Sequence, residues 1–149
     1  MKIITINKNN RYFKEFVNIN YNWWGYKKDF TLETMTKHYL DSFEKKLPKL
    51  RALISNDTLI GFYELNEKDY VDEADYTPYL ANVYIKEEYR KRGYSTLLIN
   101  DSISYAKELG YKDLYLHSKH ENYYEKYNFE FIGEVETKYG NKRIFKHKK

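Results

Sequence analysis

The stretch from residue 79 to residue 110 constrains the fold more than any other part of the sequence. An apolar run at 80–85 precedes a short basic turn at 90–95 (RKRGYS), and an amphipathic pattern follows as far as Gly110. The first N–H groups of a helix lack backbone partners, and the helix dipole places partial positive charge there. A strand that delivers three cationic side chains to such a helix start predicts an anion site, and the charge favours a phosphate.

The composition limits the class of protein. With 149 residues, 42% of them hydrophobic and 19% aromatic, the chain suits one globular domain over residues 1–149, with a core rich in Tyr and Phe rings. The absence of cysteine excludes disulfides and thiol chemistry, which fits a reducing compartment. The sequence enters a strand-like run directly after Met1, and no apolar run is long enough to cross a membrane. We therefore expect a cytoplasmic protein with no membrane partner and no metal site.

The net charge of +4 is mildly basic and by itself fits nucleic acid, a polyanionic cofactor or no special partner. Much of the excess falls in residues 138–149, where a solvated chain end is expected. No recognition-helix pattern accompanies the basic turn at 90–95. We expect no nucleic-acid partner.

Patterns in the first third of the chain predict one strand and two helices. An apolar run predicts a strand at 2–6, and an Asn-Asn pair can cap a helix that continues to about Ile19. Residues 21–26 then interrupt the helical pattern and predict a loop. Thr31 can start a second helix with apolar residues at spacings of three and four.

The runs on either side of Asn56-Asp57 predict a β-hairpin over residues 50–65, because this pair is a standard turn pair. Gly61 inside the second run indicates a bulge or a close approach by another backbone. The run at 79–85 is apolar on both faces, as in a strand covered on both sides.

Further elements are predicted after the basic turn. A strand at 114–117 follows the helix that ends at Gly110, so the two strands should be joined by a parallel crossover. Residues 121–127 predict a short helix, and residues 131–146 predict a closing hairpin. The elements together predict a single α/β unit.

Two segments allow a structural and a functional interpretation. The rings at 21–26, including Trp23 and Trp24, either pin a loop over the core or form a wall of a substrate pocket. The acidic run at 64–75 is either a solvated loop, which is the more common case, or an electrostatic funnel for a cationic substrate.

Two motifs resemble those of the GCN5-related N-acetyltransferase (GNAT) family. The turn RKRGYS at 90–95 is similar to the family's acyl-CoA loop, Arg/Gln-x-x-Gly-x-Gly/Ala, and it lies between a strand and a long helix as in that family. The segment YYEKYNF at 123–129 is similar to the family's Tyr-Glu-Lys-x-Gly-Phe segment. The resemblance extends over essentially the whole chain. It implies an α/β fold with a mixed, mostly antiparallel sheet of six to seven strands and helices on both faces.

The resemblance implies that the chain binds acetyl-CoA. Gly93 lets the backbone approach a phosphate closely, and amides at the helix start can point at the pyrophosphate. Backbone groups of Val83, Tyr84 and Ile85 would pair with the pantetheine arm, much as an added strand does. Asn122 and Lys126 match positions near the cofactor. The turn residues implied to bind coenzyme A are Arg90, Lys91, Arg92, Gly93, Tyr94, Ser95 and Thr96.

The sequence departs from the family pattern at two positions. Ser95 replaces the usual Gly or Ala, but it is small enough for close approach. Asn128 replaces the usual Gly before Phe129, and asparagine tolerates a left-handed backbone better than other non-glycine residues. We therefore expect both turns to be kept.

The resemblance assigns Tyr124 as the proton donor to the leaving thiolate, with Tyr123 as its rival. A backbone N–H near Val83 or Tyr84 would polarise the thioester carbonyl. Asn82 and His117 are also expected at the substrate. The candidates for the general base are Glu64, Asp75, Asn82 with a water molecule, and His117.

The resemblance thus implies an N-acetyltransferase that passes an acetyl group from acetyl-CoA to a primary amine by direct attack in a ternary complex. A small cationic amine is favoured by the acidic run, while protein N-termini or lysines are an alternative. A second alternative is a non-catalytic domain of the same fold that senses coenzyme A. Members of the family are often dimers, so the resemblance also allows a homodimer.

Overall fold

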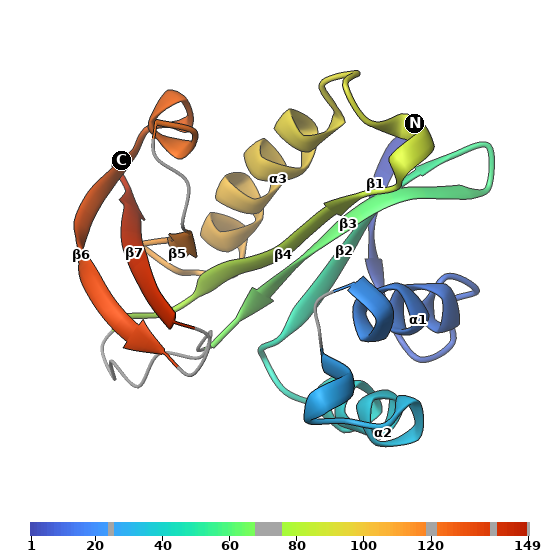
Figure 1. The fold of residues 1–149 in the computed structure, drawn as a ribbon. Coiled ribbons are helices and arrows are strands. Elements are labelled where there is room, and N and C mark those ends of the chain that lie inside the picture. Colours follow the sequence, from blue (N-terminus) through green and yellow to red (C-terminus); the bar gives the residue numbers. More distant parts are fainter. Residues whose placement is uncertain (24–25, 68–75, 119–121, 138–139, 149) are drawn as a thin grey trace.

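The computed structural model describes residues 1–23, 26–67, 76–118, 122–137 and 140–148. These residues form one seven-stranded sheet with strand order β1-β2-β3-β4-β5-β7-β6 (Figure 1). The strands are β1 (Lys2–Ile6), β2 (Lys49–Ser55), β3 (Thr58–Asn66), β4 (Tyr79–Ile85), β5 (Tyr115–Ser118), β6 (Phe129–Thr137) and β7 (Gly140–His147).

The sheet consists of two antiparallel parts joined by one short parallel contact. Strands β1 to β4 pair antiparallel in chain order, and β5, β7 and β6 form the second antiparallel part. The parallel ladder between β4 and β5 consists, over the described residues, of the single pair Tyr79 and Tyr115. Beyond Tyr79 the edge of β4 is therefore open toward β5. The expected mixed, mostly antiparallel sheet and the parallel crossover are confirmed.

Helices cover both faces of the sheet, as expected (Figure 1). Helix α3 (Tyr94–Glu108) packs Leu98, Ile99 and Ala106 into the core on one face. Helices α1 (Phe13–Trp23) and α2 (Leu32–Ser42) enclose a second core on the other face. The described residues also form three 3₁₀ turns: η1 (Tyr26–Lys28), η2 (Glu87–Tyr89) and η3 (Tyr124–Tyr127). No helix within the described ranges is long and apolar enough to span a membrane.

The helix cap and the turns form where the sequence predicts them. Thr31 is the N-cap of α2 and exchanges hydrogen bonds with Thr34 in a capping box. Asn56 and Asp57 both have positive φ, of 50° and 61°, which is the backbone of a tight two-residue hairpin. Asn128 has the expected left-handed backbone, with φ of 70°.

Gly61 marks a close approach, also as expected. A Cβ at this position would lie 2.4 Å from the backbone oxygen of Tyr84 on the neighbouring strand. Only glycine fits this contact without a shift of the strands. The end of β4 therefore lies tightly against β3.

Three boundaries were predicted wrongly. Helix α1 begins at Phe13 and continues through Trp23, so residues 21–23 are helical and not part of a loop. Burial of Phe16 and Asn20 on the inner face extends the helix beyond the predicted end. Of the predicted helix at 121–127, only η3 is helical, and strand β6 begins two residues earlier than expected.

One polar cluster fastens α3 to the sheet. Arg51 on β2 donates two hydrogen bonds of 3.1 Å to the carboxylate of Asp101 on α3, and the hydroxyl of Tyr63 donates a third at 2.6 Å. A bidentate arginine–carboxylate pair fixes orientation as well as distance. The middle of α3 is thereby held at a defined place over β2 and β3.

Candidate active site

The predicted anion site lies at the start of α3, and the backbone of this turn is unusual. Lys91 and Gly93 have positive φ, of 65° and 79°, and this turn directs the chain into the helix. A Cβ on Gly93 would have no atom within 4 Å, so the space above the turn is open. In the described part of the chain, the N–H groups of Tyr94 and Ser95 make no backbone hydrogen bond, whereas that of Thr96 donates to the Gly93 carbonyl at 3.2 Å. Helix-start N–H groups without a backbone partner, next to an open space, suit a phosphate.

Arg90, the first cation of the turn, is held at the end of β4. Arg90 donates a hydrogen bond of 2.8 Å from Nε to the carbonyl of Ile85, and its guanidinium lies over the rings of Trp23 and Tyr84. One face and the Nε of the guanidinium are therefore engaged. Arg92 makes a longer ring contact, 5.9 Å from the centre of Tyr89. All three cations of the turn, Arg90, Lys91 and Arg92, are exposed.

The open edge of β4 leads to this turn. Asn82 has positive φ, of 53°, and the register between β3 and β4 shifts beside it. Val83, Tyr84 and Ile85 follow with no described partner in β5. Exposed backbone groups on a strand edge can pair with an extended, amide-containing ligand.

The segment that carries η3 docks on the start of α3. The hydroxyl of Tyr127 shares a hydrogen bond of 2.8 Å with Thr96 Oγ1, and that of Tyr123 lies 3.4 Å from Ser95 Oγ. Lys126 Nζ lies 4.4 Å from the centre of the Tyr123 ring. The two motifs that carry the family resemblance therefore lie side by side.

Tyr124 lies on the inner side of this segment. Its ring packs against Tyr123, with centroids 4.8 Å apart, and against Phe129 and Phe145. Burial, with the charges of Tyr123 and Tyr127 as smaller causes, raises the pKa of Tyr124 to about 12. The phenol therefore keeps its proton throughout the neutral range.

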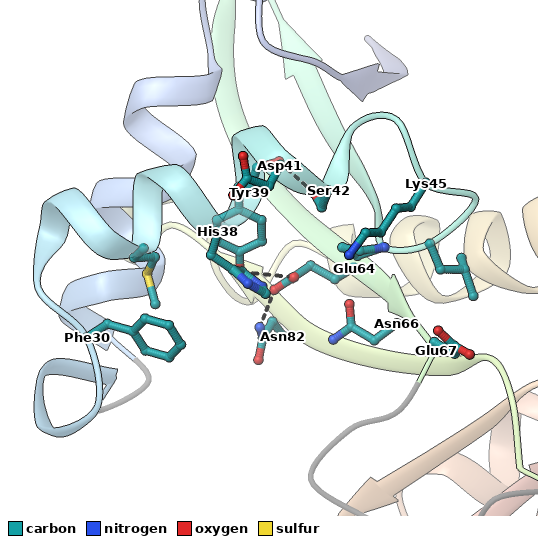
Figure 2. A pocket seen from close by; sticks show the side chains of 13 residues that line it. Phe30, His38, Tyr39, Asp41, Ser42, Lys45, Glu64, Asn66, Glu67 and Asn82 are labelled. Atoms are coloured by element: carbon teal, nitrogen blue, oxygen red, sulfur yellow. Dashed lines mark hydrogen bonds between the residues drawn. The ribbon is translucent and has the colours of Figure 1, made fainter.

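A pocket of about 720 Å³ opens on the opposite face of the sheet, between α2 and the strands β3 and β4 (Figure 2). Its walls combine rings with carboxylates and amides. The lining residues are Phe30, Met35, His38, Tyr39, Asp41, Ser42, Lys45, Leu47, Pro48, Glu64, Asn66, Glu67 and Asn82.

Glu64 lies at the centre of a buried polar network in this pocket. Only 2% of its surface is exposed. Its carboxylate accepts hydrogen bonds from the Tyr39 hydroxyl at 3.0 Å, from Asn20 Nδ2 at 3.1 Å and from Asn82 Nδ2. A carboxylate accepts from all three donors at once, which suits its ionised form. Helices α1 and α2 and strand β4 thus hold one carboxylate on β3.

His38 faces the same pocket from α2 (Figure 2). Burial and the charge of Lys45 lower its pKa below the ordinary value of 6.5, and Asp41 opposes this shift. The imidazole is therefore neutral at pH 7. Among the described lining residues, the pocket then has the carboxylates of Asp41, Glu64 and Glu67 against the single ammonium of Lys45.

The model of the acetyltransferase (GNAT) family matches residues 14–129, from α1 to the first residue of β6. The chain belongs to this family. The match includes both motifs and the pocket-lining residues.

Solved structures of other acetyltransferases share the fold of this GNAT protein. A spermidine N-acetyltransferase chimera from Vibrio cholerae has 18% identity and a TM-score of 0.76, over 99% of this chain and 95% of its own. An aminoglycoside 6′-N-acetyltransferase complexed with coenzyme A has 14% identity and a TM-score of 0.71, over 98% and 96%. An acetyltransferase from Elizabethkingia anophelis with acetyl-CoA bound has 17% identity and a TM-score of 0.67, over 99% and 97%. No curated protein matches the sequence significantly.

The predicted substrate residues of the GNAT protein are not brought together. Asn82 lines the pocket, but Trp23 exposes 52% of its surface and packs on Tyr84 outside the pocket lining. His117 lies on β5 beside Tyr79, with ring centroids 6.2 Å apart, and is also outside this lining. Trp24 lies outside the described residues, as does Asp75 among the candidate bases.

The sequence analysis did not identify His38 and Tyr39 as pocket residues, nor Asn20 as a partner of Glu64. Asn20 follows Phe16 by four positions and is completely buried on the apolar stripe of α1. A polar residue on a buried stripe needs a partner, and this pattern could have indicated a network. Tyr39 is buried on the apolar side of α2, and a buried tyrosine hydroxyl also needs a hydrogen-bond partner.

Proposed function

We propose that this chain is an acetyl-CoA-dependent N-acetyltransferase that acts on a primary amine of a small cationic molecule, by direct attack in a ternary complex. One observation carries the proposal. The acidic pocket and the open edge of β4 meet at the adjacent residues Asn82 and Val83, so an amine and an extended cofactor can approach each other across one strand.

The residues present fit acetyl-CoA. The N–H groups of Tyr94 and Ser95, next to the open space above Gly93, would hold the pyrophosphate. Lys91 and Arg92 would add positive charge. The edge at Val83, Tyr84 and Ile85 would pair with the pantetheine arm. Asn122 and Lys126 would contact the cofactor from the segment that carries η3. When bound, acetyl-CoA supplies a thioester whose acetyl group an amine can accept. Structural neighbours complexed with coenzyme A or acetyl-CoA support this assignment.

The charge of the pocket supports a cationic acceptor. Its carboxylates outnumber the ammonium of Lys45, and His38 is neutral at pH 7, so the pocket attracts an ammonium group. A second cationic group on the acceptor would lie near Asp41 or Glu67. Two neighbours of the same fold are spermidine and aminoglycoside acetyltransferases, which also favours this class.

Glu64 is the general base that we favour among the four candidates. It is the carboxylate that combines burial with a place in the pocket, and Asn82 helps to fix it. An alkyl ammonium is a far weaker acid than a carboxylic acid, so full proton transfer from the ammonium to a carboxylate is strongly unfavourable. We therefore propose that Glu64 binds the amine, which enters the reaction after losing one proton to solvent. Glu64 then accepts a second proton as the C–N bond forms and the nitrogen loses its basicity.

In this proposal, the Tyr124 hydroxyl interacts with the sulfur of the leaving coenzyme A. A thiol has a pKa of about 8.5, so a phenol with a pKa of about 12 gives up its proton to a thiolate only at a cost of roughly 5 kcal/mol. Tyr124 therefore donates a hydrogen bond to the sulfur while the C–S bond breaks, and shares its proton without losing it early. Tyr123, whose hydroxyl lies beside Ser95, has a structural role.

A thiol-release assay with a broad panel of amines, beside calorimetry with acetyl-CoA, tests the proposal. The enzyme is expected to bind acetyl-CoA and to release thiol only when an amine is present, with dications preferred over neutral amines of equal length. Binding without release across the panel, including peptides with free N-termini and lysines, would favour the sensor alternative. Equal turnover of neutral and dicationic amines would remove the preference for a cationic acceptor.

A further inference from the structure

Arg90 occupies a stack of three side chains at the end of β4. Its guanidinium carbon lies 4.9 Å from the ring centre of Trp23 and 5.4 Å from that of Tyr84. The two rings contact each other edge to face at 5.3 Å. We name these three residues, Trp23, Tyr84 and Arg90, the arginine clamp.

The arginine clamp joins three functional parts of the molecule. Trp23 is the last residue of α1, the helix that also supplies Asn20 to the network around Glu64. Tyr84 belongs to the open edge of β4 and stacks on the buried ring of Phe62, with centroids 5.3 Å apart. Arg90 begins the turn that leads to the anion site.

The contacts of Arg90 also close the loop between β4 and α3. Its Nε donates to the carbonyl of Ile85, and its backbone N–H donates to the carbonyl of Glu87 at 3.2 Å. The chain is thus held at both ends of the η2 segment. A planar guanidinium can stack on rings and donate a directed hydrogen bond at the same time, whereas a lysine ammonium cannot reproduce this geometry.

We infer that Arg90 is a positioning residue and not a phosphate ligand. Through the arginine clamp it fixes the turn at 90–93 relative to β4 and to the acceptor-side helix α1. The inference rests on the proposed function, because it concerns how that turn binds coenzyme A. It predicts that an uncharged partner, Trp23, matters for cofactor binding as much as the arginine does.

Binding measured at low and at high salt distinguishes a positioning role of Arg90 from a direct contact between its charge and a phosphate. The screening length falls from about 10 Å at 0.1 M salt to about 3 Å at 1 M, so exposed contacts between a cation and a phosphate weaken strongly. When a variant binds coenzyme A weakly because the turn is misplaced, high salt does not reduce its loss of affinity relative to the wild type. The ratio of dissociation constants between variant and wild type therefore shrinks at 1 M salt only where the lost group contacts a phosphate.

The experiment measures coenzyme A binding by calorimetry at 0.1 M and 1 M salt, with thermal melting to confirm that each variant is folded. The variants are Arg90→Gln, Arg90→Lys, Trp23→Leu, the Arg90→Gln/Trp23→Leu pair, and Lys91→Gln/Arg92→Gln as the charge control. We expect Arg90→Gln and Trp23→Leu each to weaken binding roughly three- to tenfold at both salt concentrations. The pair should be less than twofold worse than either alone, and Arg90→Lys should not restore affinity. The control should lose most of its defect at 1 M salt.

Three results would overturn the inference. They are an Arg90→Gln defect that disappears at 1 M salt, full rescue by Arg90→Lys, and Trp23→Leu with wild-type affinity. If Trp23→Leu melts early, Trp23→Phe replaces it, because a phenyl ring keeps part of the stack and should give a smaller defect of the same kind. Failure of the wild-type protein to bind coenzyme A at all would instead refute the proposed function, and the inference with it.

Discussion

The hydroxyl of Tyr39 donates a hydrogen bond of 3.0 Å to Glu64 Oε1, which joins α2 to β3 at the pocket. Asn20 adds a bond from α1 to Oε2 at 3.1 Å, and Asn82 adds another from β4. The carboxylate is therefore oriented before any ligand binds. Such preorganisation is what a group needs if it is to bind an amine and accept a proton from its nitrogen as the C–N bond forms.

Replacing Glu64 by glutamine tests this role. We expect kcat/KM for the amine to fall about 100- to 10,000-fold, while the affinity for acetyl-CoA stays unchanged. The new amide would face three donors, so we also expect a loss of about 1–3 kcal/mol in the free energy of unfolding. Steady-state kinetics, calorimetry and thermal melting measure the three quantities.

The matched control is Glu67→Gln, which removes a carboxylate from the exposed part of the same pocket. We expect only a few-fold rise in the KM of the amine, since exposed charges contribute little. Similar losses in the two variants would show that Glu64 acts only through the net charge of the pocket.

The protonation of His38 should make acceptor binding depend on pH. Its pKa is lowered in the fold, first by burial and then by Lys45, against the opposing charge of Asp41. The neutral form is therefore favoured, and its contribution to stability is present above the ordinary pKa of 6.5 and lost as pH falls through the lowered value. We expect the KM of a dicationic amine to rise below pH 6 as the imidazole gains charge.

Measurement of KM from pH 5 to pH 8 for the wild type and for His38→Gln checks this expectation. The variant should show a flatter profile, because glutamine does not titrate. A rise of equal size in both proteins would assign the pH dependence to another group.

Tyr124→Phe should lower kcat by about 10- to 100-fold with little change in the affinity for acetyl-CoA. The loss is smaller than for a full proton donor because a phenol with a pKa of about 12 contributes mainly a hydrogen bond. Tyr123→Phe removes the neighbouring hydroxyl, 3.4 Å from Ser95, and should leave kcat within about threefold. A larger loss in Tyr123→Phe than in Tyr124→Phe would reverse the assignment of the two tyrosines.

Features that depend on local chemistry could be predicted from the sequence. The hairpin at Asn56-Asp57, the cap at Thr31 and the left-handed turn at Asn128 are each set by a few neighbouring residues, and all three formed as expected. The anion turn at Gly93 belongs to the same class, since its cations, its glycine and the helix start are consecutive in the chain.

The pocket could not be predicted in the same way. Asn20, Tyr39, Glu64 and Asn82 lie on four different elements, and only the packing of both helices on the sheet brings them together. The orientation of the Arg90 side chain could not be predicted either, because the sequence shows its charge but not the two rings that it packs against. Long-range packing also extended α1 through residues that local periodicity assigns to a loop.

The close contact at Gly61 predicts that β4 is sensitive to a single methyl group. In Gly61→Ala, the new Cβ would lie 2.4 Å from the Tyr84 oxygen and 2.6 Å from Ile85 Cδ1, so the strands must separate. We expect a loss of roughly 1–3 kcal/mol in the free energy of unfolding, together with weaker coenzyme A binding. Denaturant unfolding and calorimetry measure the two effects.

Gly133→Ala is the control for Gly61→Ala. Gly133 is also a strand glycine, but a Cβ there meets no atom within 4 Å, so its stability should change by less than about 1 kcal/mol. Equal losses of unfolding free energy in the two variants would show that Gly61 is not required by its contact with β4.

A crystal structure of the ternary complex with coenzyme A and a dicationic amine would show how both ligands bind. We expect pyrophosphate oxygens at the N–H groups of Tyr94 and Ser95, the pantetheine arm along Val83 to Ile85, and the sulfur beside the Tyr124 hydroxyl. We also expect the amine nitrogen within hydrogen-bond distance of the Glu64 carboxylate, either directly or through one water. An amine bound outside the α2 pocket, or a cofactor whose sulfur lies far from both Glu64 and Tyr124, would contradict the proposed function.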